Sequence, residues 1–399
     1  MSRTTLIVVA VLGVLLLAAV ATFASAPLFW ERYFGAHLAP TARVPAWYQP
    51  RERVVGGDQP PAPRVTPDLE SIDARALEAA ASYAGREGSL ALIVARHDHI
   101  VFERYWQGTS FDTLVDSQSF ARVLAALLTG SAIAHRRIGW PDEPVGYLVS
   151  EWRGDPRGAI TLRNLMHFSS GLAPAGADGA PWGAAARARF GTDITAALLR
   201  RPLAGTPGEG RVVQPADVQL LALALERGTG ERYAAYLSQA LWRRIGAADA
   251  WLYLDRPGGA AHADCCMLAR QGDWIRIAEL MLGDGNYRGW EVIRPGWVAA
   301  LRTPAAGDQE HGSYLLLSAA AAGAKQPYMA RDTYSLENEG GNRLWLIPSL
   351  RLAILSTATL PRAAGFDEAR IPNLIVSGVR DFVPPAARPG DVSAIVPGH

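Results

Sequence analysis

The sequence of 399 residues has almost no lysine. Lys325 is the only one, although lysine and arginine together number 39. Because arginine keeps its proton at any ordinary pH, a mechanism that needs a neutral amine as a base has one candidate in the whole chain. Charge of one sign is also lacking, since the formal net charge is +1. No strong field therefore points to nucleic acid, and we expect no nucleic-acid partner.

Cysteine is scarce as well. Cys265 and Cys266 are the only two, and they are adjacent. Adjacent cysteines rarely form a disulfide, and these lack the spacing of zinc ligands, so we expect two small buried side chains. His97 and His99 share one face of a predicted hairpin, but only Asp98 lies nearby in the sequence and no third ligand is evident. We expect no metal site and no cofactor.

There is one long hydrophobic run, at residues 6–26, and it carries no charge. As a helix it would span roughly 30 Å, the thickness of a bilayer core. Arg3 precedes it and favours a cytoplasmic N-terminus. The run is either a cleaved signal peptide, with Ala24-Ser25-Ala26 as the cleavage site, or an uncleaved anchor. Pro27 disfavours cleavage, so we predict a single-pass anchor in the inner (cytoplasmic) membrane, with the domain facing the periplasm or outside.

The remaining chain divides by composition. Residues 1–5 are predicted to be a short cytoplasmic segment. Residues 27–68 are rich in proline and arginine and show no helical or strand period, so we predict an extended juxtamembrane linker. Helix and strand signals alternate over residues 69–386, which we predict to form one domain. Residues 387–399 are predicted to be an irregular tail.

Strand signals lie at both ends of this domain, and helical signals lie between them. Strands are predicted around the hairpin at 97–99 and over 333–358; helices are predicted over 69–84, 117–137, 160–172, 216–226, 231–245, 273–282 and 371–382. This order predicts an α/β (α+β) fold, in which remote segments form an antiparallel sheet flanked by helices and a helical lobe is inserted.

Several segments, in order, also resemble a known family. They include "LLTGSAIAHRRIGWPDEPVGYL", "ITLRNLMHFSSGL", the stretch from 207 to 255, and "NEGGNRLWLIPSLRLAIL". From about residue 69 to 382 the chain resembles the serine β-lactamase-related hydrolases. These include class C β-lactamases, D-Ala-D-Ala carboxypeptidases, esterases and 6-aminohexanoate-dimer hydrolases. The resemblance implies a β-lactamase/transpeptidase-like fold with a pocket between the sheet and the helical lobe.

The family uses a Ser-x-x-Lys pair at the start of a helix, where the serine attacks a carbonyl and the lysine acts on its proton. The corresponding residues here are Ser119 and Arg122. A guanidinium cannot act as a base. The resemblance thus implies Ser119 as the candidate nucleophile, whereas Ser119 taken alone is simply a residue in the first turn of a helix.

Two further family elements differ in this sequence. The catalytic tyrosine position is occupied by Val213 and the following Asn/Ser position by Pro215, and neither side chain transfers a proton. The Lys-Thr-Gly or His-x-Gly segment, which binds substrate and shapes the oxyanion hole, corresponds to Glu339-Gly340-Gly341. Its glycines persist, but its cation has become a carboxylate, which disfavours a carboxylate-bearing substrate. Lys325 lies upstream in a predicted loop.

Two functions remain open at this point. In the first, the chain is an active serine hydrolase that cleaves an amide or ester with Ser119 as nucleophile. In the second, which we favour, it is an impaired relative that binds a small molecule or peptide, such as cell-wall peptide, or another envelope protein. Arg122, Val213 and Glu339 favour the second, because general-base activation contributes about 10²- to 10⁴-fold and no base is visible.

Overall fold

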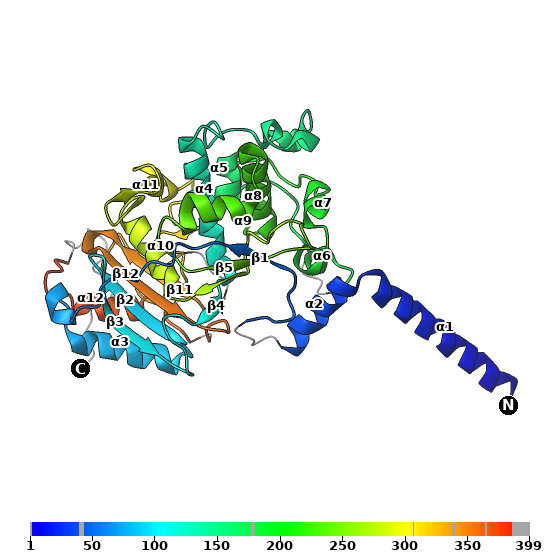
Figure 1. The fold of residues 1–399 in the computed structure, drawn as a ribbon, viewed down its shortest axis with the longest axis horizontal. Coiled ribbons are helices and arrows are strands. Elements are labelled where there is room, and N and C mark those ends of the chain that lie inside the picture. Colours follow the sequence, from blue (N-terminus) through cyan, green and yellow to red (C-terminus); the bar gives the residue numbers. More distant parts are fainter. Residues whose placement is uncertain are drawn as a thin grey trace.

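The computed structural model describes residues 2–39, 44–176, 180–305, 307–336, 340–363 and 365–384. Its largest sheet has six antiparallel strands, contributed by both ends of the domain (Figure 1). The strands in spatial order are β3 (His99–Tyr105), β2 (Ala91–Arg96), β12 (Leu352–Thr357), β11 (Arg343–Ile347), β10 (Tyr334–Leu336) and β9 (Leu315–Leu316). The predicted antiparallel sheet built from remote segments is confirmed.

The two central strands are buried on both faces. Every residue of β2 and of β12 is buried, as expected for near-continuous runs of apolar side chains. Alternate residues face opposite sides: Ile354 packs with α3 (Ala74–Arg86) and α12 (Arg370–Ser377), whereas Leu355 belongs to the core shared with α10 (Asp273–Leu282). The sheet is therefore the middle layer between two sets of helices.

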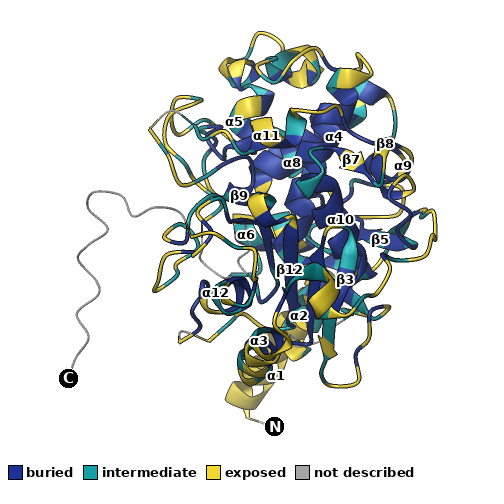
Figure 2. Cartoon of the chain, turned by 90° about the vertical axis from the view of Figure 1, so that its left-hand side faces the viewer, coloured by how far each residue is buried: buried dark blue, intermediate teal, exposed yellow. Residues whose placement is uncertain are grey.

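The helical lobe packs around α4 (Ala121–Ala134), which is buried over residues 121–132. This burial suits a helix that is apolar on all sides. Helices α8 (Pro215–Thr229), α9 (Tyr233–Leu237) and α11 (Trp297–Leu301) pack on α4; α5 (Leu162–Met166) and α7 (Ile194–Leu199) pack on α8, and α6 (Ala184–Phe190) packs on α7. The dark core in Figure 2 runs without a break from this lobe into the sheet.

A four-stranded sheet connects the lobe to the N-terminal part of the chain. Its order is β1 (Arg51–Val54), β5 (Ala250–Tyr253), β6 (Met267–Arg270) and β4 (Leu114–Asp116), and all of its pairs are antiparallel. A two-stranded ribbon, β7 (Asn286–Tyr287) with β8 (Trp290–Glu291), completes the strands of the described residues. Because β4 leads directly into the α4 region, this smaller sheet positions the candidate nucleophile.

The expectation that 27–68 is an extended linker is wrong for much of its length. Residues Pro27–Leu38 form α2, and β1 pairs with β5 of the domain. No helical or strand period is visible in this segment, because the contacts that order it come from remote residues. Phe29 of α2 packs against Phe190 of α6. The predicted tail at 387–399 lies outside the described residues.

Arg32 fixes α2 to the domain. Its guanidinium is fully buried and lies over the ring of Tyr48, 4.5 Å from the centroid. It donates hydrogen bonds to five backbone carbonyl oxygens, those of Gln49, Phe190, Gly191, Leu254 and Asp255. A buried cation needs such a complete set of acceptors, because an unsatisfied charge is costly away from water.

Before α2 comes α1 (Arg3–Ser25), a helix of 23 residues in which an 18-residue window has a mean hydropathy of 3.0. None of its residues is buried, and it projects away from the rest of the molecule (Figure 1). It is the one helix among the described residues that is long and apolar enough to cross a membrane. An N-terminal signal sequence has the same length and composition.

We predict that Arg32→Ala lowers the free energy of unfolding by about 3 kcal/mol or more, since it leaves five carbonyl groups without their charged donor. Urea unfolding followed by tryptophan fluorescence measures the change. The matched control is Arg86→Ala, at an exposed position of α3, with an expected change within about 0.5 kcal/mol. Equal losses in the two variants would contradict the role assigned to Arg32.

Candidate active site

Ser119 lies in a single 3₁₀ turn, Gln118–Phe120, between β4 and α4. Strand β6 holds the start of this turn: Ser117 N donates to Met267 O at 2.8 Å, and Met267 N donates to Ser117 Oγ at 3.0 Å. The Ser119 side chain is buried, with 7% of its surface exposed. Among the described residues, no group forms a hydrogen bond with its hydroxyl. The predicted placement of Ser119 at the start of this buried helix matches the structure.

Arg122 follows one helical turn later and is also buried. Its Nε donates to the backbone oxygen of Asp264 at 3.3 Å, and its guanidinium lies 5.5 Å from the ring centroid of Phe168. Arg211 lies over the same ring at 5.4 Å. Two cations therefore gather at one aromatic ring on this side of the helix. Such groups stabilise negative charge but do not remove a proton from a hydroxyl.

Val213 and Pro215 lie at the entry to α8. Val213 packs against the hydrophobic core, and Pro215 occupies the first turn of the helix, where a missing N–H costs nothing. Between them, the buried Gln214 donates its Nε2 to Leu172 O at 3.2 Å. This segment therefore has a structural role, since Gln214 holds the loop after α5 against the start of α8.

Gly341 is brought beside the candidate nucleophile by Gln118. The Oε1 atom of Gln118 accepts from the backbone N–H of Gly341 at 2.8 Å and from that of Asn342 at 3.3 Å, while its Nε2 donates to Ala358 O at 3.3 Å. A Cβ on Gly341 would collide with the backbone oxygen of Leu360, so glycine is required there. Gly340 accepts from Arg343 at 2.7 Å through its backbone oxygen, and Glu339 lies outside the described residues.

Gln118 was not singled out from the sequence. It has a φ of 51°, in the left-handed region that few residues other than glycine, asparagine and aspartate adopt. Its three side-chain hydrogen bonds tie the turn of Ser119 to the edge of β11 and hold it in that conformation. No sequence period signals such a residue, because its partners are more than 200 positions away.

The histidines and the lysine lie elsewhere. His97 and His99 each form a hydrogen bond of 2.7 Å with one oxygen of the Glu70 carboxylate, which lies 27 and 29 positions away in the sequence. His167 is buried, and burial lowers its pKa to about 4. Lys325 donates to Gly365 O at 3.0 Å in an exposed loop. None of the four contacts Ser119.

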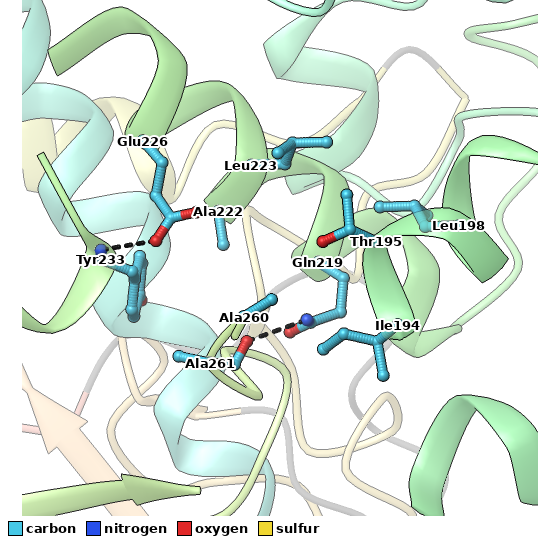
Figure 3. A pocket seen from close by; sticks show the side chains of 10 residues that line it. All are labelled: Ile194, Thr195, Leu198, Gln219, Ala222, Leu223, Glu226, Tyr233, Ala260 and Ala261. Carbon is cyan, nitrogen blue, oxygen red and sulfur yellow. Dashed lines mark hydrogen bonds between the residues drawn. The ribbon is translucent and has the colours of Figure 1, made fainter. Parts of the chain in front are cut away.

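A cavity of about 500 Å³ adjoins the Pro215 side of this site. Its wall includes Arg187, Arg200, Arg201 and Asp264, and the rest is mainly alanine, proline, isoleucine and leucine. It lies between the loop at 173–175 and helices α6, α7 and α8. A second void nearby is only about 10 Å³, room for a single water (Figure 3). The larger cavity has the volume of a small-molecule site.

The two cysteines differ from the expectation. Cys265 and Cys266 are joined by a disulfide, so the prediction of two separate small buried side chains is wrong. Cys266 has a φ of 69°, and both residues are only partly buried. They follow Asp264, the acceptor for Arg122, and precede Met267, the partner of Ser117. The disulfide therefore lies on the segment that contacts both ends of the nucleophile turn.

Asp217, in the first turn of α8, was also missed. It accepts from Ser170 Oγ at 2.7 Å, and burial raises its pKa from 3.8 to about 7 despite this hydrogen bond. A carboxyl group whose pKa is higher in the folded state stabilises the fold at low pH. That contribution is lost as the pH rises from about 4 through 7.

We therefore predict that Asp217→Asn removes part of the pH dependence of stability. The free energy of unfolding of the wild type minus that of the variant should fall by roughly 2–4 kcal/mol between pH 4 and pH 8, because only the wild type must bury a charge at high pH. Urea unfolding at the two pH values measures the difference. A difference that is the same at both would contradict the raised pKa of Asp217.

Comparisons with known proteins agree with this architecture. A family model described as Beta-lactamase matches residues 74–325. The 6-aminohexanoate-dimer hydrolase of Paenarthrobacter ureafaciens is 27% identical over 226 residues, which cover 53% of this chain and 56% of that enzyme, so the match spans little more than half of the relative.

Among solved structures, a Bacillus anthracis protein proposed to be a 6-aminohexanoate-dimer hydrolase superposes with a TM-score of 0.67 at 16% identity, over 85% of this chain and 92% of that one. A Bacteroides dorei protein proposed to be a beta-lactamase gives 0.63 at 18% identity, over 77% and 99%. These likenesses establish the fold, and the family model covers more than half of the sequence. The chain belongs to the beta-lactamase family of serine hydrolases.

Proposed function

We propose that this chain is a membrane-anchored, outward-facing member of the family whose catalytic turnover is impaired and which binds a ligand beside the former reaction centre. One observation carries the proposal: among the described residues, no base forms a hydrogen bond with the hydroxyl of Ser119. A serine hydroxyl is a weak nucleophile unless a neighbouring group takes its proton.

The residues at the family's proton-transfer positions support this reading. Arg122 stays protonated and is engaged with Asp264 O and the Phe168 ring, and Val213 has no titratable group. General acid–base catalysis contributes about 10²- to 10⁴-fold, so its loss leaves a reaction rate that is small compared with that of a working hydrolase.

The backbone N–H groups near Ser119 also support impaired catalysis. A reacting carbonyl needs N–H groups aimed at the oxygen that becomes negative. The N–H groups of Gly341 and Asn342, at the edge of β11, already donate to Gln118 Oε1. A substrate that used either donor would first have to displace the Gln118 side chain, and with it the hydrogen bonds that hold the turn of Ser119.

The large cavity supports a retained binding role. Its volume of about 500 Å³ is in the range of small-molecule sites, and it adjoins Pro215 and Asp264 at the edge of the candidate site. Arg187, Arg200 and Arg201 line it, so we propose a ligand with a carboxylate or phosphate group, such as a cell-wall peptide. An envelope protein that presents an acidic segment fits the same chemistry.

The anchoring part of the proposal rests on α1 and on the way α2 is held. Helix α1 has the length and hydropathy of a membrane span, and Arg3 marks its cytoplasmic end by the positive-inside rule. Helix α2 follows after Ala26 and is fixed to the domain by Arg32. We infer an inner-membrane protein with its domain outside the cytoplasm.

The test is covalent labelling of the full-length protein with a fluorophosphonate and with a labelled penicillin, read by intact mass. We expect no more adduct on the wild type than on Ser119→Ala, because the serine lacks a base. Stoichiometric labelling that disappears in Ser119→Ala would overturn the proposal and favour the alternative, an active hydrolase of an amide or ester with Ser119 as nucleophile.

A gain-of-function variant sharpens this test. The double substitution Arg122→Lys and Val213→Tyr returns the two family side chains, and we expect fluorophosphonate labelling to rise by about tenfold or more over the wild type. The matched control is Arg122→Met with Val213→Phe, which has similar volumes but no proton-transfer group. Equal labelling of the two doubles would show that the missing base does not limit the reactivity of Ser119.

A further inference from the structure

We propose that His262, Asp264 and Cys265 form a binding site for a divalent metal ion that accepts sulfur, such as Zn²⁺ or Cd²⁺. The Cys265–Cys266 disulfide blocks metal binding, because it keeps the Cys265 sulfur bonded to Cys266. One ligand atom from each of the three residues lies within 4.8 Å of the others. His262 and Asp264 are buried, with 3% and 8% of their surfaces exposed. This site shares Asp264 with the wall of the large cavity, but its metal binding does not depend on the ligand function proposed above.

Tyr48 orients the ring of His262. The Tyr48 hydroxyl lies 3.0 Å from the backbone oxygen of Arg189 and is also hydrogen-bonded to His262 Nε2. The other ring nitrogen, Nδ1, is therefore directed toward the side chain of Asp264.

This side of the ring faces a carboxylate. His262 Nδ1 and Asp264 Oδ1 are 3.9 Å apart in a buried setting, which is beyond hydrogen-bond distance. Nitrogen, oxygen and sulfur donors together are a set that Zn²⁺ binds, and a hydrogen bond to the far nitrogen of a histidine ligand is the usual way its ring is oriented. Tyr48 supplies this second contact.

The loop that carries these ligands is held from α8. Gln219 Oε1 accepts from Ala263 N at 2.6 Å and from Asp264 N at 3.2 Å. Its Nε2 donates to Ala261 O at 3.0 Å (Figure 3). These bonds fix the backbone on both sides of His262 and at Asp264. A preorganised loop loses less conformational freedom when a ligand binds, which favours a discrete site over an accidental cluster.

The disulfide determines whether sulfur is available. While Cys265 is bonded to Cys266, its Sγ is not a thiolate and is a poor metal ligand. A thiol or phosphine reductant supplies two electrons: with two thiols, the S–S bond breaks, both cysteines gain a proton, and the thiols form a disulfide of their own. A metal ion then replaces the proton on Cys265 and releases it to solvent.

The location connects this site to the rest of the protein. The backbone oxygen of Asp264 accepts from Arg122, and Asp264 also lines the large cavity. A metal ion held by Asp264 would place a double positive charge at the cavity wall that the three arginines already make positive. Reduction of the disulfide would thereby change the affinity of the cavity for anions.

The experiment uses the full-length protein in nanodiscs. One sample stays oxidised, and the other is reduced with tris(2-carboxyethyl)phosphine and desalted without oxygen. Each is titrated with Cd²⁺, and the ultraviolet absorption of the sulfur-to-cadmium charge transfer is recorded. We expect about one equivalent to bind to the reduced protein, with an affinity at least tenfold higher than that of the oxidised protein. The absence of this absorption in the reduced protein would overturn the proposal.

Two serine variants provide matched controls, since either one prevents the disulfide. Cys266→Ser keeps the proposed ligand and should bind Cd²⁺ with or without reductant, whereas Cys265→Ser should not show the charge-transfer band. Asp264→Asn, tested in the Cys266→Ser background, should weaken binding about tenfold or more. Equal binding by the two serine variants would overturn the proposal. Circular dichroism confirms that each variant is folded.

Discussion

The pairing of β2 with β12 is the interaction on which the rest of the molecule depends. Leu352 pairs with Arg96 and Thr357 with Ala91, so six consecutive residues near the start of the domain meet six near its end. All side chains of both strands are buried. The helical lobe lies in the chain between these strands, so its two ends are held together only once this pairing forms. Closing the chain of some 250 residues between these strands costs conformational entropy. The burial of both strands and of the helices packed on the two faces of the sheet offsets this cost.

The smaller sheet positions the turn of the candidate site relative to the large sheet. Strand β4 leaves the sheet at Asp116, and the next residue, Ser117, is bonded to Met267 through both its backbone and its hydroxyl. Gln118 links the same turn to the end of β11 in the large sheet. Ser119 is thus held in place from two sheets at once, by contacts that suit the positioning of a nucleophile.

Much of the fold was predictable because its evidence is local. The buried runs of β2 and β12, the apolar helix α4 and the family segments around them are visible in single stretches of sequence. The start of the helix that carries Ser119 and Arg122 followed from the same segments. What escaped prediction depends on remote partners: Arg32 finds its acceptors up to 223 positions away, and the side chain of Gln118 finds its own more than 220 positions away. Composition and periodicity carry no trace of such contacts.

The fixed position of α2 has a consequence for where this protein can act. If α1 spans the membrane, the chain that leaves the bilayer becomes a helix after one residue, and that helix is clamped to the domain by the five carbonyl contacts of Arg32. A domain on a flexible tether samples a wide volume above its membrane, and its reach grows with the length of the tether. With α1 in a membrane, the domain would stay close to the bilayer. Its cavity beside α6 would then meet mainly ligands near the membrane surface, so the location of a ligand would affect its binding as well as its chemistry.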